Sequence, residues 1–368
     1  MKGCDVMNIL LIDNNFEGAY GSLNVFIREI QEELLLLKHH VFLSGSVDDS
    51  IRYIKENAID FSLGLGKYNQ FKNGVPIYDL LRIMHYQWII DNPLKIKIDN
   101  NSSYIKYIVI DKLFFSCLNK RYNKSLFFPL GVPSFHIRNY ENQNRGIVFS
   151  GQIRDANKIY SDISEHYLKK KIDNVIEHQI ENLEKPYINI LNYETNNMTY
   201  EQKRQVFMFS NSYLRAYKRE IVLSSIKEYP VYIVGENHNE KLGLKKNFTF
   251  FGKVNYRTAF KIMARYYFAL NIEPNFNDGI HDRVLRSIQN GNMVVTNFNN
   301  FQNDLFKNTL LYYQYSSIPD VIDSLSDIHY EEIREKNRQA QLVVEREFGW
   351  NSIIQKIIEN YRESEINV

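Results

Sequence analysis

Cysteine is scarce in this chain, with only Cys4 and Cys117 among 368 residues. The two could form one disulfide, but such sparse use is more typical of a reducing compartment than of a secreted, disulfide-stabilised protein. We therefore expect a cytoplasmic protein whose stability comes from buried apolar side chains.

Long apolar runs are also missing. The run Ile9–Ile12 is too short for a signal peptide or a membrane span, and no other stretch approaches the roughly 18 apolar residues that a span requires. The sequence therefore predicts a soluble protein with no transmembrane segment.

A surplus of one charge is absent as well. The 45 basic and 43 acidic residues leave a formal charge of +2, which gives no reason to expect a nucleic-acid partner. The basic run Lys169–Lys171 sits among acidic residues and is typical of a solvated helix face. His39, His40 and His238 lack the spacing of metal ligands, so we predict no metal site.

What the chain does have is length and a regular alternation of apolar strands with helices. A chain of 368 residues favours two domains. Short apolar segments alternate with helical patterns such as 23–37, 79–84, 256–267 and 282–290, which indicates parallel sheets covered by helices. The predicted strands are 8–12, 41–44, 61–65, 86–90, 105–110 and 125–129, then 146–151, 229–234, 248–252, 268–272 and 293–296.

The periodicity breaks near Pro129–Pro133, and polar residues follow to Arg145. We place the domain boundary there. The predicted fold is α/β, with two Rossmann-like doubly wound parallel-sheet domains facing a cleft. The predicted domains are residues 1–135, residues 146–350 with a helical insertion at 157–228, and a C-terminal helix at 351–368 that crosses back to the first domain.

The segment 271–291 carries the clearest chemical signal. A strand ends, a polar loop containing Gly279 follows, and a helix begins near Asp282. Free amides at a helix N-terminus, together with a flexible glycine, suit an anion. Arg283 lies on the first turn of this helix, where a guanidinium can grip a diphosphate, and His281 could donate to a phosphate.

The motif Asp278-Gly-Ile-His-Asp-Arg283-Val-Leu, with Gly291 six residues later and then Val294-Val-Thr296, resembles the C-terminal domain of CgeB-like glycosyltransferases of the GT-B group. The resemblance extends over the whole chain, more weakly in its first half. Further matching segments are 88–93, 128–131, 147–151, 231–235 and 248–256.

The resemblance implies a metal-independent transferase of the hexosyl type that uses a nucleotide-sugar as substrate and no cofactor. It implies that the donor binds mainly the second domain and that an acceptor protein or glycan meets the first. The residues placed at the donor by position are Glu273, Asp278, Gly279, His281, Arg283 and Arg286, with Arg215 and Arg219 of a preceding helix, beside Lys218.

Arg286 departs from the family pattern. Related enzymes usually carry a glutamate there, five residues before the glycine at Gly291, to hold the nucleotide ribose, and its acidic partner falls on Asp278. A guanidinium has no acceptor for ribose hydroxyls. Either ribose is held otherwise, with Glu273 as one substitute, or the donor is unusual, or donor binding is lost.

The first domain offers candidates for the acceptor side. Gly18 and Gly21 precede a helix in a loop that resembles the acceptor loop of GT-B enzymes, although the Gly-x-Gly-x-x-Gly fingerprint is absent. An inverting transferase needs a general base. The candidates for that base follow or begin predicted strands of the first domain: Asp13, His85, Asp91 and Asp111.

Two other readings stay open from the sequence. The chain could be a non-catalytic glycosyltransferase-like subunit that binds a protein partner, a reading that Arg286 favours. It could instead be another two-lobed α/β protein, such as a sugar-phosphate epimerase, which would need a clearer pair of catalytic carboxylates or histidines than the sequence offers.

Overall fold

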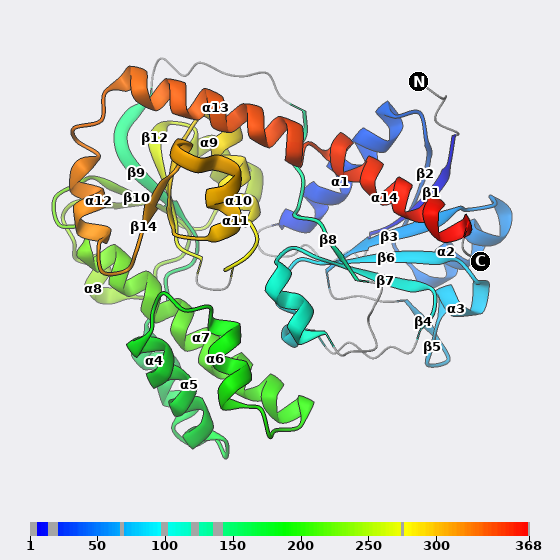
Figure 1. The fold of residues 1–368 in the computed structure, drawn as a ribbon, viewed down its shortest axis with the longest axis horizontal. Helices are drawn as coiled ribbons and strands as arrows, with labels where there is room; N and C mark the ends of the chain where they lie inside the picture. The colour runs from blue at the N-terminus through cyan, green and yellow to red at the C-terminus, as the bar shows by residue number, and fades with distance from the viewer. Residues whose placement is uncertain are drawn as a thin grey trace. The chain divides into compact units, whose positions relative to one another are not determined.

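The computed structural model describes residues 6–13, 21–66, 70–96, 102–118, 125–134, 143–273 and 276–366. The chain divides into two compact units (Figure 1). Unit 1 comprises Met1–Phe135, Asn255–Arg257 and Val344–Val368, and unit 2 comprises His136–Val254 and Thr258–Val343.

Unit 1 is built on a parallel six-stranded sheet with the order β2-β1-β3-β6-β7-β8. Its strands are short apolar runs such as β3 and β7, whose residues are all buried, as expected for a sheet covered on both faces. The strands are β1 (Asn8–Ile12), β2 (His40–Ser44), β3 (Phe61–Leu65), β6 (Met84–Ile89), β7 (Ile105–Val109) and β8 (Leu126–Phe127).

The connections in unit 1 are short helices and one hairpin. They are α1 (Ser22–Leu36), α2 (Val47–Glu56), the hairpin of β4 (Phe71–Lys72) and β5 (Val75–Pro76), α3 (Ile77–Leu81), and the 3-10 helices η2 (Pro93–Lys95) and η3 (Lys112–Cys117). The helix predicted at 79–84 is wrong in its second half, because Arg82 adopts a left-handed conformation that ends α3, and β6 begins at Met84.

Unit 2 contains a second parallel six-stranded sheet, with the order β11-β10-β9-β12-β13-β14. Its strands are β9 (Asn144–Ser150), β10 (Val231–Val234), β11 (Phe248–Phe250), β12 (Tyr266–Asn271), β13 (Met293–Asn297) and β14 (Leu311–Tyr313). Helices α8 (Glu240–Gly243), α9 (Tyr256–Met263), α10 (Asp282–Gln289), α11 (Asn300–Phe306), α12 (Ile318–Ser324) and the 3-10 helix η4 (Lys307–Thr309) connect them.

A helical insertion separates β9 from β10. It consists of α4 (Ala156–Ile163), α5 (Lys169–Glu181), α6 (Tyr187–Glu194) and the long α7 (Tyr200–Ser225), and the shorter helices gather along α7 (Figure 1). A capping box between Thr199 and Gln202 begins α7. This arrangement confirms the prediction that the segment is helical and has no strand.

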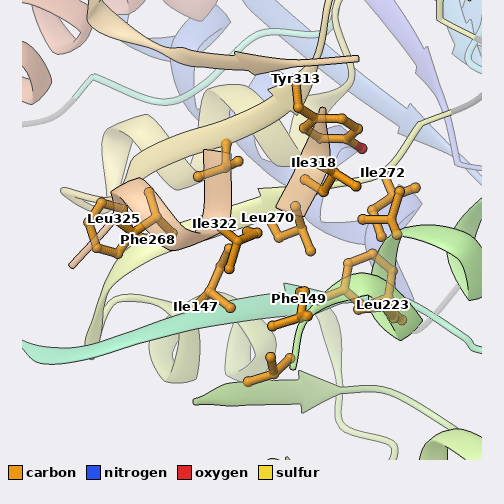
Figure 2. Packing of buried hydrophobic residues seen from close by; sticks show 14 of the residues in the cluster. Ile147, Phe149, Leu223, Phe268, Leu270, Ile272, Tyr313, Ile318, Ile322 and Leu325 are labelled. Carbon is orange, nitrogen blue, oxygen red and sulfur yellow. The ribbon is translucent and has the colours of Figure 1, made fainter. Parts of the chain in front are cut away.

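The main core of unit 2 lies on one face of its sheet. Phe149, Phe268 and Leu270 project from neighbouring strands and meet Ile318 and Ile322 of α12 (Figure 2). The opposite face packs Val148 and Ala269 against Ile262 and Met263 of α9. The helix predicted at 256–267 ends earlier, at Met263, because Tyr266 already belongs to β12.

Two C-terminal helices complete the fold. Helix α13 (Tyr330–Phe348) is followed by α14 (Trp350–Ile366), which belongs to unit 1 and contacts α1. The indole Nε1 of Trp350 donates to Glu29 Oε2 of α1 at 2.9 Å, and its ring meets Trp88 of β6 edge to face. A Cβ on Gly131 would stand 2.4 Å from Trp350 Cε3, so only glycine fits beside the indole.

Candidate functional site

The site is built at the carboxyl edge of the sheet in unit 2, where strand order reverses. The chain runs from β9 outward to β11 on one side and resumes at β12 on the other side of β9. Ligands of open α/β sheets bind outside the carboxyl ends of the strands at such a reversal. The residues that follow β9 and β12 here are Gly151, Gln152 and Glu273.

A close approach of two backbones shapes this edge. Gly235 follows β10 with φ +148°, and a Cβ there would lie 2.3 Å from the carbonyl oxygen of Gly151. Any other residue at Gly235 would push the ends of β9 and β10 apart. The glycine therefore keeps the strand ends in register beside the site.

Helix α10 directs its N-terminus at this edge. His281 is its N-cap, and the backbone N–H of Arg283 donates to His281 Nδ1 at 3.1 Å. The Arg283 side chain turns back to the end of β12, where Nη1 donates to Asn271 Oδ1 at 3.3 Å. The backbone N–H groups of Arg283 and Val284 are bonded to His281 at the helix start. The positive end of the α10 dipole and a guanidinium thus lie at the same place, which is an arrangement suited to an anion.

Two more guanidinium groups come from α7, one helical turn apart. Arg219 is buried, and its Nη1 donates to the carbonyl oxygen of Gln152 at 2.7 Å. Arg219 and Arg283 both lie over the ring of Phe149, with Cζ at 5.6 and 5.9 Å from the ring centroid. Burial, together with the charges of Arg215 and Arg283, lowers the pKa of Arg219 to about 9, so it stays charged at neutral pH.

Glu273 is the carboxylate among these cations. Its residue is 2% exposed, and its backbone N–H donates to Asn297 Oδ1 at 3.3 Å. Burial alone would raise the pKa of Glu273, but His281, Arg215, Arg219 and Arg283 outweigh burial and lower it. Glu273 is therefore ionised at neutral pH.

The imidazole of His281 lies between two carboxylates. Its Nε2 is 3.4 Å from Glu273 Oε2, and its Nδ1 is 2.7 Å from Asp282 Oδ1. Because Nδ1 accepts from the backbone N–H of Arg283, Nε2 is the ring nitrogen that faces Glu273.

Three polar atoms around this cluster have no hydrogen-bond partner among the described residues. They are Glu273 Oε2, Arg219 Nε and the hydroxyl of Tyr315, and all three are buried. Tyr315 follows β14, and the charges of Glu273 and Arg219 both act on it. Buried polar atoms left unsatisfied in this way mark a place where a ligand or water completes the hydrogen bonds.

Tyr313, Tyr315 and Glu184 border the site but did not stand out in the sequence. The Tyr313 hydroxyl donates to the carbonyl oxygen of Asn271 at 3.1 Å, and Glu184 Oε1 accepts from the backbone N–H of Tyr315 at 2.6 Å. The sequence signal for these residues was the short run Leu311–Tyr313, which ends in tyrosines. Had it been recognised as a parallel strand, its carboxyl end would have been expected at the same sheet edge as the site.

Lys218 lies between Arg215 and Arg219 in the sequence of α7. Its Nζ donates to the carbonyl oxygen of Leu183 at 3.0 Å and lies 4.9 Å from the centroid of the Tyr315 ring. Burial lowers the pKa of Lys218 to about 8, and Glu184 opposes that shift. These contacts hold the Lys218 ammonium group between Leu183 and Tyr315.

The remaining donor-side candidates lie around α10. Gly279 is buried, and its carbonyl oxygen accepts from Asn299 Nδ2 at 3.1 Å, while Asp278 is half-buried. Arg286 is 5% exposed, and its Nη1 donates to Gln289 Oε1 at 3.5 Å within the same helix. The cationic groups that lower the pKa of Glu273 include those of His281, Arg215, Arg219 and Arg283.

The base candidates of unit 1 have diverse surroundings. Asp13 follows β1, Asp91 is paired with Lys95 at 2.7 Å, and Asp111 is fully buried as the N-cap of η3. His85 is buried in β6 with Nδ1 2.9 Å from Ser62 Oγ and Nε2 3.1 Å from Gln87 Oε1. Burial lowers the pKa of His85 to about 4, so the ring is neutral.

The acceptor loop is described only at its end. Gly21 is the N-cap of α1, with a left-handed φ of +80° that suits glycine, and Gly18 lies outside the described residues. Within the described ranges, no group of three His, Cys, Asp or Glu side chains could hold a metal ion. Across those same ranges, no helix combines the length and apolar character that crossing a bilayer requires.

Two Rossmann-like parallel-sheet units define the GT-B fold, and this class is supported by solved structures that match nearly the whole chain. HepE of Anabaena in complex with UDP-glucose has 10% identity and a TM-score of 0.57, over 97% of this chain and 100% of that chain. A glycosyltransferase from Rickettsia africae has 11% identity and a TM-score of 0.56, over 98% and 99%.

A third solved structure of the same fold is AviGT4, a glycosyltransferase involved in avilamycin A biosynthesis, with 11% identity and a TM-score of 0.55 over 97% of both chains. Residues 215–359 match a family model described as glycosyl transferase-like. No match was found among curated protein sequences. The matched segment begins at Arg215 and contains Glu273, His281 and Arg283.

Proposed function

We propose that this protein is a glycosyltransferase that moves a sugar of the hexosyl type from a nucleotide-sugar donor to an acceptor protein or glycan. The observation that carries the proposal is the convergence of Arg215, Arg219 and Arg283 with the N-terminus of α10 at the strand reversal of unit 2. A diphosphate leaving group gains negative charge as its bond to the sugar breaks, and fixed cations stabilise that charge.

The donor diphosphate would lie against α10, with Arg283 and Arg219 as its main ligands. Because three guanidinium groups are already present, we propose that the reaction needs neither a metal ion nor a cofactor. The family match of residues 215–359 supports the transferase class. We further propose a place among the CgeB-like enzymes, a cytoplasmic location, and acceptor binding by unit 1 near Asp13 and Gly21.

His85 has no part in this proposal, because both ring nitrogens are already hydrogen bonded inside the sheet. Asp13 remains the proposed base, since it follows β1 at the carboxyl edge of the sheet in unit 1. The order of that sheet reverses between β1 and β3, which is where a ligand of unit 1 would bind.

Calorimetric titration with ADP, CDP, GDP and UDP, each with and without EDTA, tests the donor site. UDP-glucose is the first complete donor to add, because HepE was solved with it. We expect one of the four to bind with a micromolar Kd that EDTA leaves unchanged. If none of them binds, the donor site is refuted and the non-catalytic reading takes its place; loss of binding in EDTA would refute metal independence.

A further inference from the structure

Glu273 is a buried anion in the middle of a cation cluster, and the proposed diphosphate site explains the cations but not the carboxylate. One of its oxygens, Oε2, has no hydrogen-bond donor among the described residues, although His281 Nε2 lies 3.4 Å away. A buried carboxylate left in this state is costly unless a ligand or charge partner compensates it. Its position therefore calls for a role in the recognition of the ligand.

The charges around the site can be counted from the groups that act on Glu273. Arg215, Arg219 and Arg283 carry three positive charges, and Glu273 carries one negative charge, which leaves a net charge of +2. His281 and Asp282 lie 2.7 Å apart beside these groups and stay unchanged in the variants described below. Arg154 acts on Arg219 as well, but it is exposed and screened by solvent.

The two forms of a nucleotide that such a site meets differ by one charge. In a nucleotide-sugar both phosphates are esters, so the diphosphate carries a charge of −2. In the free nucleoside diphosphate the terminal phosphate has no ester bond and keeps a second ionisable oxygen with a pKa of about 6, so the charge of the diphosphate approaches −3 at neutral pH. The negative charge of Glu273 opposes a ligand charge of −3 more strongly than one of −2, so removing Glu273 should favour the second form more than the first.

We propose that Glu273 is a specificity-determining residue that sets the site to prefer a sugar-linked diphosphate over the free nucleoside diphosphate released by the reaction. This inference rests on the proposed donor site. Glu273 opposes the extra charge of the product and thereby favours its release. The unpartnered Oε2 also offers an acceptor to a hydroxyl group of the sugar-linked ligand, which adds to the same preference.

The test is the ratio of two dissociation constants, Kd(UDP) divided by Kd(UDP-glucose), measured by calorimetry. If the nucleotide panel selects another base, the same ratio is measured for that nucleoside diphosphate and its sugar-linked form. In Glu273→Gln the ratio should fall at least tenfold, because at an effective dielectric near 20 a unit charge within about 12 Å of the extra phosphate charge changes affinity by about that factor or more. The inhibition constant of UDP should fall in parallel.

Arg215→Gln provides a second, opposite test. This substitution removes one positive charge from the site. UDP, which carries the larger negative charge, should therefore lose more affinity than UDP-glucose, and the ratio should rise. Arg215 is half-buried, so this variant remains informative even where Glu273→Gln fails to fold. Glu236→Gln is the matched control, because Glu236 follows β10 at the same sheet edge but pairs with His238 and Lys253.

The outcomes separate this inference from the proposed function. Opposite shifts in the Glu273 and Arg215 variants, with an unchanged ratio in Glu236→Gln, support the role of Glu273. Both ligands binding to every variant with an unchanged ratio would overturn that role and leave the donor site intact. No binding of either ligand to the unaltered protein would overturn both.

Discussion

At the scale of single residues, Arg283 is the most direct test of the site, because it joins the first turn of α10 to the end of β12 through Asn271. We expect Arg283→Ala to weaken nucleotide binding ten- to a hundredfold, since the loss of a hydrogen bond to a charged group costs about 1.5–3 kcal/mol. The measurement is calorimetric titration with the nucleotide that the panel selects.

Arg265→Ala is the control for Arg283→Ala. Arg265 is exposed and immediately precedes β12, at the opposite end of that strand from Asn271. The Arg265→Ala substitution removes the same charge as Arg283→Ala but leaves the carboxyl edge of the sheet unchanged. An Arg283→Ala protein that unfolds at the same urea concentration as the original and still binds nucleotide with the original Kd would remove Arg283 from the site.

His85 predicts a pH dependence of stability. The unfolded chain binds a proton at this ring with a pKa of 6.5, whereas burial lowers the folded pKa to about 4. The unfolded state therefore binds more protons between these values, and the free energy of unfolding decreases as the pH falls from 6.5 to 4. The contribution amounts to about 2 kcal/mol between pH 7 and pH 5.

Urea unfolding at pH 7 and at pH 5 measures this effect. Other groups titrate in the same range, so the comparison is with His85→Gln, which keeps a hydrogen-bonding side chain but carries no titratable ring. The variant should lose less stability than the original protein over this interval. An equal loss in the two proteins would show that His85 does not remain neutral in the fold.

At the scale of secondary-structure elements, the attachment of α14 to unit 1 depends on the space beside Gly131. In Gly131→Ala the new Cβ would meet the indole of Trp350 at 2.4 Å, and the ring would have to leave Glu29 and Trp88. Overpacking of this kind costs about 1–3 kcal/mol. We expect the midpoint of urea unfolding to fall accordingly.

Trp350→Leu in the Gly131→Ala background is the check on that explanation. If the destabilisation comes from the clash with the ring, the smaller side chain relieves it, and the double variant is less destabilised than the sum of the two single variants. Strict additivity of the two effects would place the cost of the alanine elsewhere. Both proteins are compared at one pH to keep the contribution of His85 constant.

At the scale of the whole molecule, the sequence predicted the two parallel sheets well, because fully buried strands are short continuous apolar runs such as Phe61–Leu65 and Met293–Asn297. It did not predict β14 or the helices between Asn300 and Phe348. Strand β14 has three residues, of which Leu311 and Tyr312 are only half-buried, so its apolar pattern is too short to separate from a loop.

The candidate site shows a similar division. The sequence singled out Arg283 and His281 at a helix start after a strand, and Arg215 and Arg219 on one face of an earlier helix. That these two groups meet depends on Arg219 reaching the end of β9 at Gln152, a tertiary contact that no local pattern contains. For Arg286 the motif predicted a place at the nucleotide ribose. In the structure its guanidinium donates to Gln289 on the same helix, a partner that the motif does not indicate.

The membership of α14 in unit 1 has a consequence for synthesis on the ribosome. Domains usually fold in the order in which they emerge. Here the indole that fills the space at Gly131 and bonds Glu29 belongs to residue 350, so unit 1 stays incomplete until that part of the chain has been made. Unit 2, which ends at Val343, is fully synthesised first, although unit 1 begins the chain. A nascent chain arrested before Trp350 would therefore expose the surface of α1 to chaperones and proteases.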